Sequence, residues 1–147
     1  MISRHICSFL FVMLAIAPQA RADDAADVST AVNDLYSKLK SNDAPGFSAF
    51  VPSEGFTEFN PESGELKNLN MEFFRGAMDS GSKIDLHVSD LKVQILGQCA
   101  IVTGYRVGSI TLPDGKRLES NQCLTMVWAK EPPGWKLHHV HLSNRPH

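Results

Sequence analysis

Three histidines lie within four residues near the C-terminal end of this 147-residue chain, in the segment GWKLHHVHLS. An imidazole can bind a metal ion or exchange a proton near neutral pH, so such a cluster can serve a metal site or acid–base catalysis. The segment alternates apolar and polar residues, which is typical of a β-strand whose successive side chains point to opposite faces of a sheet. We therefore expect His138 on one face, and His139 and His141 together on the other.

A metal site at His139 and His141 would need further ligands. Cys123 is expected opposite His141, but zinc and copper sites use three or four such ligands and no third one is fixed by spacing. We therefore predict no metal site and no cofactor. The histidine pair is assigned instead to an interface, where it hydrogen-bonds Thr125 or another subunit.

The turn LPDGK sets the position of the second candidate, Arg106. Its proline and glycine suit a type I turn followed by a glycine bulge, which pairs Leu112 with Lys116. A two-residue turn would exchange the two faces, and its closing pair would need an N–H that Pro113 lacks. The favoured register places Arg106 opposite Gln122.

A three-residue loop at 131–133 then pairs Met126 with His138. The inner face is predicted to carry Val102, Gly104, Arg106, Gln122, Leu124, Met126, Trp128, His138, Val140 and Leu142. The outer face is predicted to carry Ile101, Tyr105, Cys123, Thr125, Val127, Trp135, Leu137, His139, His141 and Ser143. The mostly apolar inner face should lie under helices and line a cavity. The outer face is too apolar to be freely solvated, which indicates a homo-oligomer that buries part of it.

An inward arginine on a central strand is costly unless it is paired with a negative group. Two alternatives remain open: a ligand, or a carboxylate of the chain such as Glu62 or Glu72. A small ligand with an acidic or carbonyl group and an apolar body fits the surroundings. An inward His138 is either a hydrogen-bonded core residue or a general base. The candidate ligand-binding residues are Arg106, His138, Gln122, Met126, Leu142, Phe74 and Tyr36.

The elements that position these residues follow from the hydrophobic pattern. Apolar residues at helical spacing predict a helix over 23–43, followed by a short helix or turn at 44–51, a hairpin at 55–66 and a helix over 70–81. Asn70 is its expected N-cap and Gly81 its C-cap. Period-two alternation predicts four long strands at 83–96, 99–112, 116–130 and 135–143, the first with a bulge near Ser89 and Asp90. This order predicts an α+β fold: a curved antiparallel sheet with about three helices against one face.

The first 22 residues are predicted to be a secretory signal peptide. Arg4 and His5 precede an apolar run, and Ala20 and Ala22 occupy the small-residue positions before a cleavage site. Cleavage would leave one exported domain, residues 23–147, in the periplasm or outside the cell and free of the membrane; the alternative is an uncleaved anchor. The formal net charge would move from −2 to −4, and no basic block suggests nucleic acid as a partner.

Two cysteines remain in that domain. The derived register separates Cys99 and Cys123 by about six residues along the sheet, roughly 20 Å. A disulfide needs Cα atoms within about 7 Å, so we predict that both thiols are free.

Five segments resemble one known family in order and spacing: TEFNPE, EFFRG, GYRV, TMVW and GWKLHHVHLS. They are similar to the calcium/calmodulin-dependent kinase II association domain, within the nuclear-transport-factor-2-like superfamily that includes the SnoaL-like proteins. The resemblance covers roughly 28–145 and implies a cone with a central pocket that assembles through its outer sheet face. No kinase signature is present.

The pocket implied by the resemblance is altered here. Arg106 stands at one of several arginine positions, whereas Met126 and Leu142 occupy two others. Phe74 replaces a histidine and Ser82 replaces a tryptophan. The favoured function is therefore an exported, oligomerising, small-molecule-binding domain with one anion-facing arginine. The alternative is an isomerase, dehydratase or cyclase of the ketosteroid isomerase or SnoaL type, which would need an inward carboxylic acid near Arg106.

Overall fold

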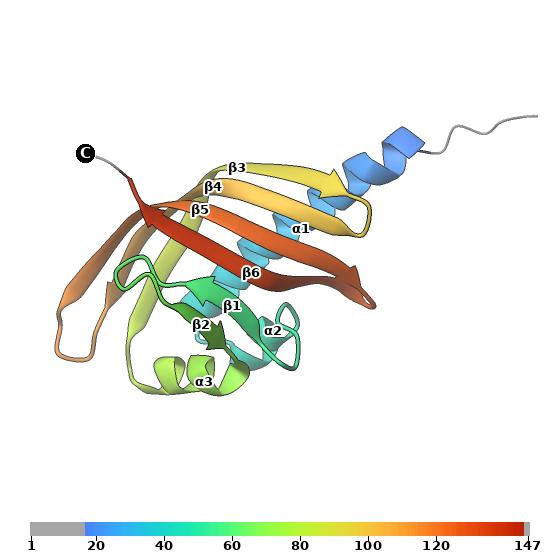
Figure 1. The fold of residues 1–147 in the computed structure, drawn as a ribbon. Coiled ribbons are helices and arrows are strands. Elements are labelled where there is room, and N and C mark those ends of the chain that lie inside the picture. Colours follow the sequence, from blue (N-terminus) through green and yellow to red (C-terminus); the bar gives the residue numbers. More distant parts are fainter. Residues whose placement is uncertain (1–16, 146–147) are drawn as a thin grey trace, which may run out of the picture.

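The computed structural model describes residues 17–145 (Figure 1). In chain order the elements are α1 (Ala17–Lys40), α2 (Ala44–Ser48), β1 (Phe56–Phe59), β2 (Leu66–Leu69), α3 (Met71–Asp79), β3 (Lys83–Leu96), β4 (Cys99–Thr111), β5 (Arg117–Glu131) and β6 (Gly134–Asn144). The fold is α+β, as predicted, and the expected helices, hairpin and long strands are all present. The apolar run of the predicted signal peptide lies outside the described residues, apart from Ala17.

Helix α1 lies across one face of the curved sheet (Figure 1). The apolar stripe predicted for it is buried, with Val28 and Val32 fully covered and Leu35, Tyr36 and Leu39 at most 7% exposed. The stripe fixes which side of the helix faces the sheet. Within residues 17–145, no helix is long and apolar enough to cross a bilayer.

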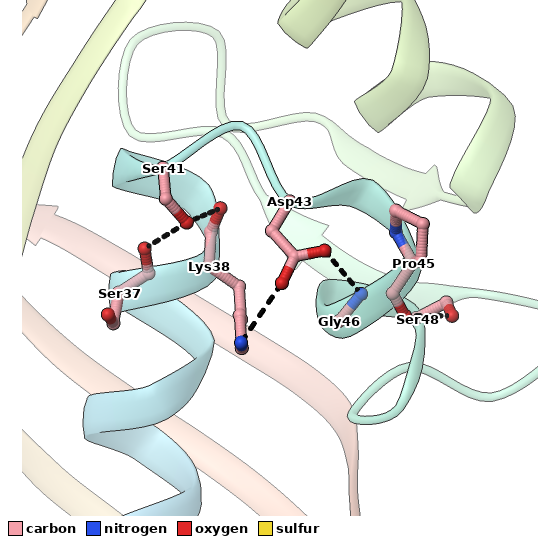
Figure 2. A network of polar contacts seen from close by, with 7 residues as sticks. All are labelled: Ser37, Lys38, Ser41, Asp43, Pro45, Gly46 and Ser48. Carbon is pink, nitrogen blue, oxygen red and sulfur yellow. Dashed lines mark hydrogen bonds and ion pairs between the residues drawn. The ribbon is translucent and has the colours of Figure 1, made fainter.

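A polar network fixes the corner between α1 and α2 (Figure 2). Asp43 is the N-cap of α2, because its Oδ1 accepts a hydrogen bond of 2.9 Å from the Gly46 N–H. Its Oδ2 lies 2.9 Å from Nζ of Lys38 on α1. Both contacts hold the pKa of the Asp43 carboxyl below its usual range. The corner directs the fully buried Phe47 of α2 toward the core.

The sheet has the strand order β2-β1-β6-β5-β4-β3. Strands β3 to β6 form the predicted antiparallel meander. A hairpin of β1 and β2 is present as predicted, but its second strand extends to Leu69, beyond the predicted end at 66. The hairpin joins β6 in parallel, with Glu58 opposite Val140. This long-range pairing places the β1–β2 hairpin at the edge of the sheet beside α3 (Figure 1).

The register of β4 and β5 is confirmed. Leu112 and Lys116 close the turn, and the Leu112 N–H donates to the Lys116 carbonyl at 2.8 Å. Arg106 lies opposite Gln122, as predicted. Cys99 and Cys123 are both free, and they pair with Ala129 and Tyr105 at well-separated positions of the sheet.

The predicted register of β5 and β6 was wrong. Pairing closes at Glu131 and Gly134, so the loop holds two residues rather than three. A further one-residue shift falls between Val127 and Trp128, and it leaves His138 as the extra residue of a bulge. The early part of β6 therefore turns its other side inward.

Because of this bulge, three residues of β6 lie on the opposite face from the one predicted. Trp135 and Leu137, expected outside, are buried at 6% and 1% exposure. His138, expected inside, instead places its Nε2 at 2.6 Å from Oε1 of Glu131 near the hairpin loop. Beyond the bulge, Val140 and Leu142 are buried as predicted.

The bulge predicted in β3 is confirmed. Pairing with β4 shifts between Ser89 and Lys92, and Asp90 has a φ of 51°. Ile84 and Leu86 face the core before the bulge, and Val93 faces it afterwards. Opposite β3, Gly108 has a φ of 123°, and a Cβ there would lie 2.1 Å from the Asp85 carbonyl oxygen. Only glycine permits this close approach, which bends the sheet around its inner face.

Candidate functional site

A cavity of about 420 Å³ lies between the inner sheet face and the helices. Its walls are mainly apolar: Leu35, Leu39, Phe47, Phe56, Leu69, Phe73, Phe74, Ala77, Ile84, Leu86, Ile110, Leu112, Leu118, Met126, Leu137 and Val140. Polar groups come from Tyr36, Glu58, Asn60, Lys67, Ser80, Ser82 and Arg106. A mostly apolar cavity of this size with a few polar groups is typical of a small-molecule site.

Arg106 is held at the cavity wall by its neighbour on β5. Its Nη2 and Nε donate to Oε1 of Gln122 at 2.6 and 3.2 Å, and Nε also lies 3.3 Å from Oγ of Ser120. A guanidinium has five N–H groups. Nη1 and the second hydrogen of Nη2 have no hydrogen-bond partner within residues 17–145. Arg106 therefore retains donors for a molecule in the cavity.

Neither carboxylate that was considered as an ion-pair partner of Arg106 takes that role in the described part of the chain. Glu62 and Glu72 are exposed and make no ion pair with Arg106 in the described part of the chain. The orienting contacts come from an amide and a hydroxyl, which leave the positive charge of Arg106 uncompensated at contact distance. The arginine is therefore not tied up in a structural salt bridge.

Glu58 is a site residue that the sequence analysis missed. It lies on β1, only partly exposed, and lines the same cavity as Arg106. Burial raises the pKa of the Glu58 carboxyl, while the positive charges of Arg106 and Lys67 act in the opposite direction. Within residues 17–145 its carboxylate makes no hydrogen bond and no ion pair within 4.0 Å. An unpaired carboxyl in an apolar cavity is a typical acid–base or ligand-contacting group.

Tyr36 completes the polar end of the cavity from α1. Burial raises the pKa of its phenol to about 12; the positive charge of Arg106 acts to lower this pKa, and the negative charge of Glu58 adds to the increase. The hydroxyl therefore stays protonated at neutral pH. It makes no hydrogen bond within residues 17–145, so it can donate one to a ligand oxygen.

The structure brings together four of the seven predicted site residues: Tyr36, Phe74, Met126 and Arg106 line the cavity. Gln122 lies behind Arg106 and orients it. Leu142 is buried in the core and His138 lies at the β6 bulge, and neither lines the cavity.

The outer histidines lie where β1 joins β6. Nδ1 of His139 is 2.8 Å from Oγ1 of Thr57, and His141 lies opposite Thr125 in the register, with no side-chain hydrogen bond to it in the described part of the chain. Phe59 lies against both His139 and His141, with ring centroids 5.8 and 5.5 Å away. Among the described residues no group of three or more potential metal ligands is assembled.

The fold and cavity define a class of protein: a curved sheet wrapped by helices around one interior pocket. The chain belongs to the SnoaL-like domain family, which matches residues 28–146. No curated protein matches the chain at a significant level.

Solved structures agree with this assignment. The CaMKII hub of S. rosetta is 28% identical, with a TM-score of 0.67 over 82% of this chain and 96% of that one. The association domain of C. elegans CaMKII is 22% identical, with a TM-score of 0.66 over 85% and 98%. An NTF2-like superfamily protein from Salmonella enterica is 16% identical, with a TM-score of 0.71 over 86% and 94%. The resemblance derived from the sequence motifs is therefore confirmed.

Proposed function

We propose that the cavity binds a small molecule with an apolar body and a carbonyl-bearing head group, acidic or neutral, which Arg106 holds. The observation that carries this proposal is the set of unused N–H groups of Arg106 at the wall of an apolar cavity. Water solvates a guanidinium poorly in an apolar cavity. A ligand oxygen that accepts hydrogen bonds from the unused N–H groups therefore stabilises the charge. Tyr36 can donate a second hydrogen bond to the same head group.

A test begins with the full chain expressed so that it is exported. Native mass spectrometry should detect a retained small molecule that is released on unfolding. Arg106→Met keeps side-chain bulk and removes the charge, and it should abolish retention. Arg75→Met, on the exposed side of α3, is the matched control and should retain the molecule. Equal retention by the Arg106 variant would refute the proposal.

A second candidate is an acid–base enzyme acting on a carbonyl compound: an isomerase, dehydratase or cyclase. The observation that favours it is Glu58, an inward carboxyl of raised pKa in the same cavity as Tyr36 and Arg106. Such a carboxyl can take a proton from carbon or oxygen while Tyr36 and Arg106 stabilise the oxyanion. Loss of turnover in Glu58→Gln with retained ligand binding would distinguish this candidate from binding alone.

Assembly through the outer sheet face is part of the same proposal. Tyr105, Val127 and His139 lie on that face only partly covered by the chain itself. The similarity to a protein described as a CaMKII hub supports an oligomer. Sedimentation should give a mass above one chain, and Val127→Glu should lower it, because a buried charge opposes association. A wild-type monomer at micromolar concentration would contradict this part.

Export from the cytoplasm is proposed from the N-terminal sequence, with cleavage after Ala22. Edman sequencing of protein recovered from the cell envelope or medium should begin at Asp23. Intact Met1 in the cytosolic fraction would contradict export.

A further inference from the structure

Glu58 and Arg106 face one cavity from different strands, and in the described structure they form neither a hydrogen bond nor an ion pair with each other. Glu58 comes from β1 and Arg106 from β4, and both line the cavity. Within the described residues their charged atoms form no ion pair within 4.0 Å, and the guanidinium is held toward Gln122 instead. A carboxylate with only acceptors and a guanidinium with spare donors therefore remain available to a molecule between them.

Two positive charges act on Glu58 from the cavity wall, Arg106 and the more exposed Lys67. Arg106 on β4 contributes one positive charge, and Tyr36 on α1 contributes a neutral hydroxyl. Lys67 on β2 is exposed, so water solvates its ammonium group. Phe74 of α3 and Val140 of β6 complete the surroundings without charge. An anion entering the cavity would meet Glu58 as well as Arg106.

We propose that Glu58 sets the ligand class of this cavity: head groups that are neutral when bound and that both accept from Arg106 and donate to Glu58, such as a primary amide or a protonated carboxylic acid. The inference rests on the proposed binding function and specifies its ligand. A primary amide has the required C=O acceptor and N–H donors in one plane.

A carboxylate can enter the cavity only with one added proton. Two carboxylates in a low-dielectric site do not both stay ionised, so the ligand and Glu58 would share a proton taken from solvent. The raised pKa of Glu58 favours that uptake. Where Glu58 is ionised, affinity for an amide should therefore be independent of pH, while affinity for the matching carboxylate should fall as the pH rises.

Octanamide and octanoate are suitable probes, because they share one apolar chain and differ in head-group charge. Titration calorimetry of the full chain at pH 8 should show octanamide binding at least about tenfold more tightly, since a like-charge contact is costly. Parallel titrations in two buffers of different ionisation enthalpy should show uptake of close to one proton with octanoate and none with octanamide.

Glu58→Gln is the decisive variant. It should bind octanoate with no proton uptake and at least about tenfold more tightly than wild type at pH 8. Glu65→Gln removes one exposed carboxylate of the same hairpin and should behave as wild type. An unchanged octanamide-to-octanoate ratio in Glu58→Gln, or no proton uptake by wild type, would overturn the inference.

The same titrations separate this inference from the proposed function. Failure of both probes to bind, or unchanged binding in Arg106→Met, refutes the function itself. Binding that needs Arg106 but ignores Glu58 refutes only the assignment of ligand class.

Discussion

The inner face of the sheet has two halves that share strands β5 and β6 but are packed differently. In the closed half, Trp128 of β5 and Trp135 of β6 are buried in the core, with 0% and 6% of their surface exposed. In the open half, the same strands line a cavity of about 420 Å³ that contains Glu58 and Arg106. Bulky aromatic residues thus fill and stabilise one half. The other half is less tightly packed and contains a cavity with unpaired polar groups.

An ion pair joins the closed half to α1. Lys130 forms an ion pair with Asp24 of α1 and lies over the ring of Trp135, 5.8 Å from its centroid. Nε1 of Trp128 and Nε1 of Trp135 are buried and find no hydrogen-bond partner among residues 17–145. These indoles therefore contribute through apolar contact rather than through hydrogen bonds. The comparison indicates that stability resides in the closed half and ligand chemistry in the open half.

The largest expected effect is on stability in the closed half. Trp128→Ala should lower the free energy of unfolding by about 3–5 kcal/mol, because it leaves a cavity in a tightly packed site. Urea unfolding followed by circular dichroism measures the loss. Phe73→Ala at the open half, where Phe73 is 53% exposed, should cost less than about 1 kcal/mol. Equal losses for the two variants would contradict the comparison.

The next effect is on binding in the open half. Arg106→Met should weaken octanamide binding by about 1.5–3 kcal/mol, the usual contribution of a hydrogen bond that involves one charged group. The free energy of unfolding should fall by only about 1 kcal/mol, because only the hydrogen bonds to Gln122 and Ser120 are lost. Calorimetry and urea unfolding measure the two quantities separately. A fall in stability as large as the loss of affinity would make Arg106 a structural residue.

The two halves also differ in how far the sequence predicted them. The LPDGK turn was enough to place Arg106 opposite Gln122, because a short turn fixes the register of both strands. The side on which Trp135 and Leu137 lie was missed, because it depends on a loop one residue shorter and on the bulge at His138. A bulge is a local departure from alternation, and HHVH contains no glycine or other residue that marks it.

Glu58 was missed for a different reason. It enters the cavity because β1 pairs in parallel with β6, about eighty residues further along the chain. Neither the composition of TEFN nor its alternation specifies that partner, and parallel pairing requires a long connection whose path the pattern does not give. Tyr36, by contrast, lines the cavity as expected, because the apolar stripe of α1 already fixed its side of the helix.

A smaller effect concerns the wall formed by α3. Asn70 is the N-cap of α3, as expected, because its Oδ1 accepts a hydrogen bond of 3.0 Å from the Phe73 N–H. The helix ends at Asp79, and its C-cap is Ser80, one residue before the predicted Gly81. Asn70→Ala should lower the free energy of unfolding by about 1 kcal/mol. Because α3 borders only the open half, hydrogen exchange should accelerate in 71–79 more than around Trp128. Uniform acceleration would show that the halves unfold together.

The smallest expected effect is the pH dependence that Glu58 gives to stability. Burial raises its pKa, but Arg106 and Lys67 oppose the increase, so the net contribution is modest. An acid whose pKa is higher in the folded state binds its proton more tightly there. Stability is therefore greatest below the unfolded-state pKa and decreases as the pH rises through the folded-state pKa. Glu58→Gln removes this titration, and Glu65→Gln controls for the loss of one surface charge on the same hairpin.

The test measures the free energies of unfolding of wild type and Glu58→Gln from pH 4 to pH 8. As the pH rises from the unfolded-state to the folded-state pKa of Glu58, the variant should become more stable relative to wild type. Above the folded-state pKa the difference between the two should be constant. The difference between wild type and Glu58→Gln cancels the contribution of the other titrating groups, and Glu65→Gln shows what the loss of one exposed carboxylate does by itself. If wild type instead gained stability over Glu58→Gln as the pH rose, the attraction of Arg106 would outweigh the cost of burial. Glu58 and Arg106 would then act as a structural ion pair, and the open half, like the closed one, would be built for stability.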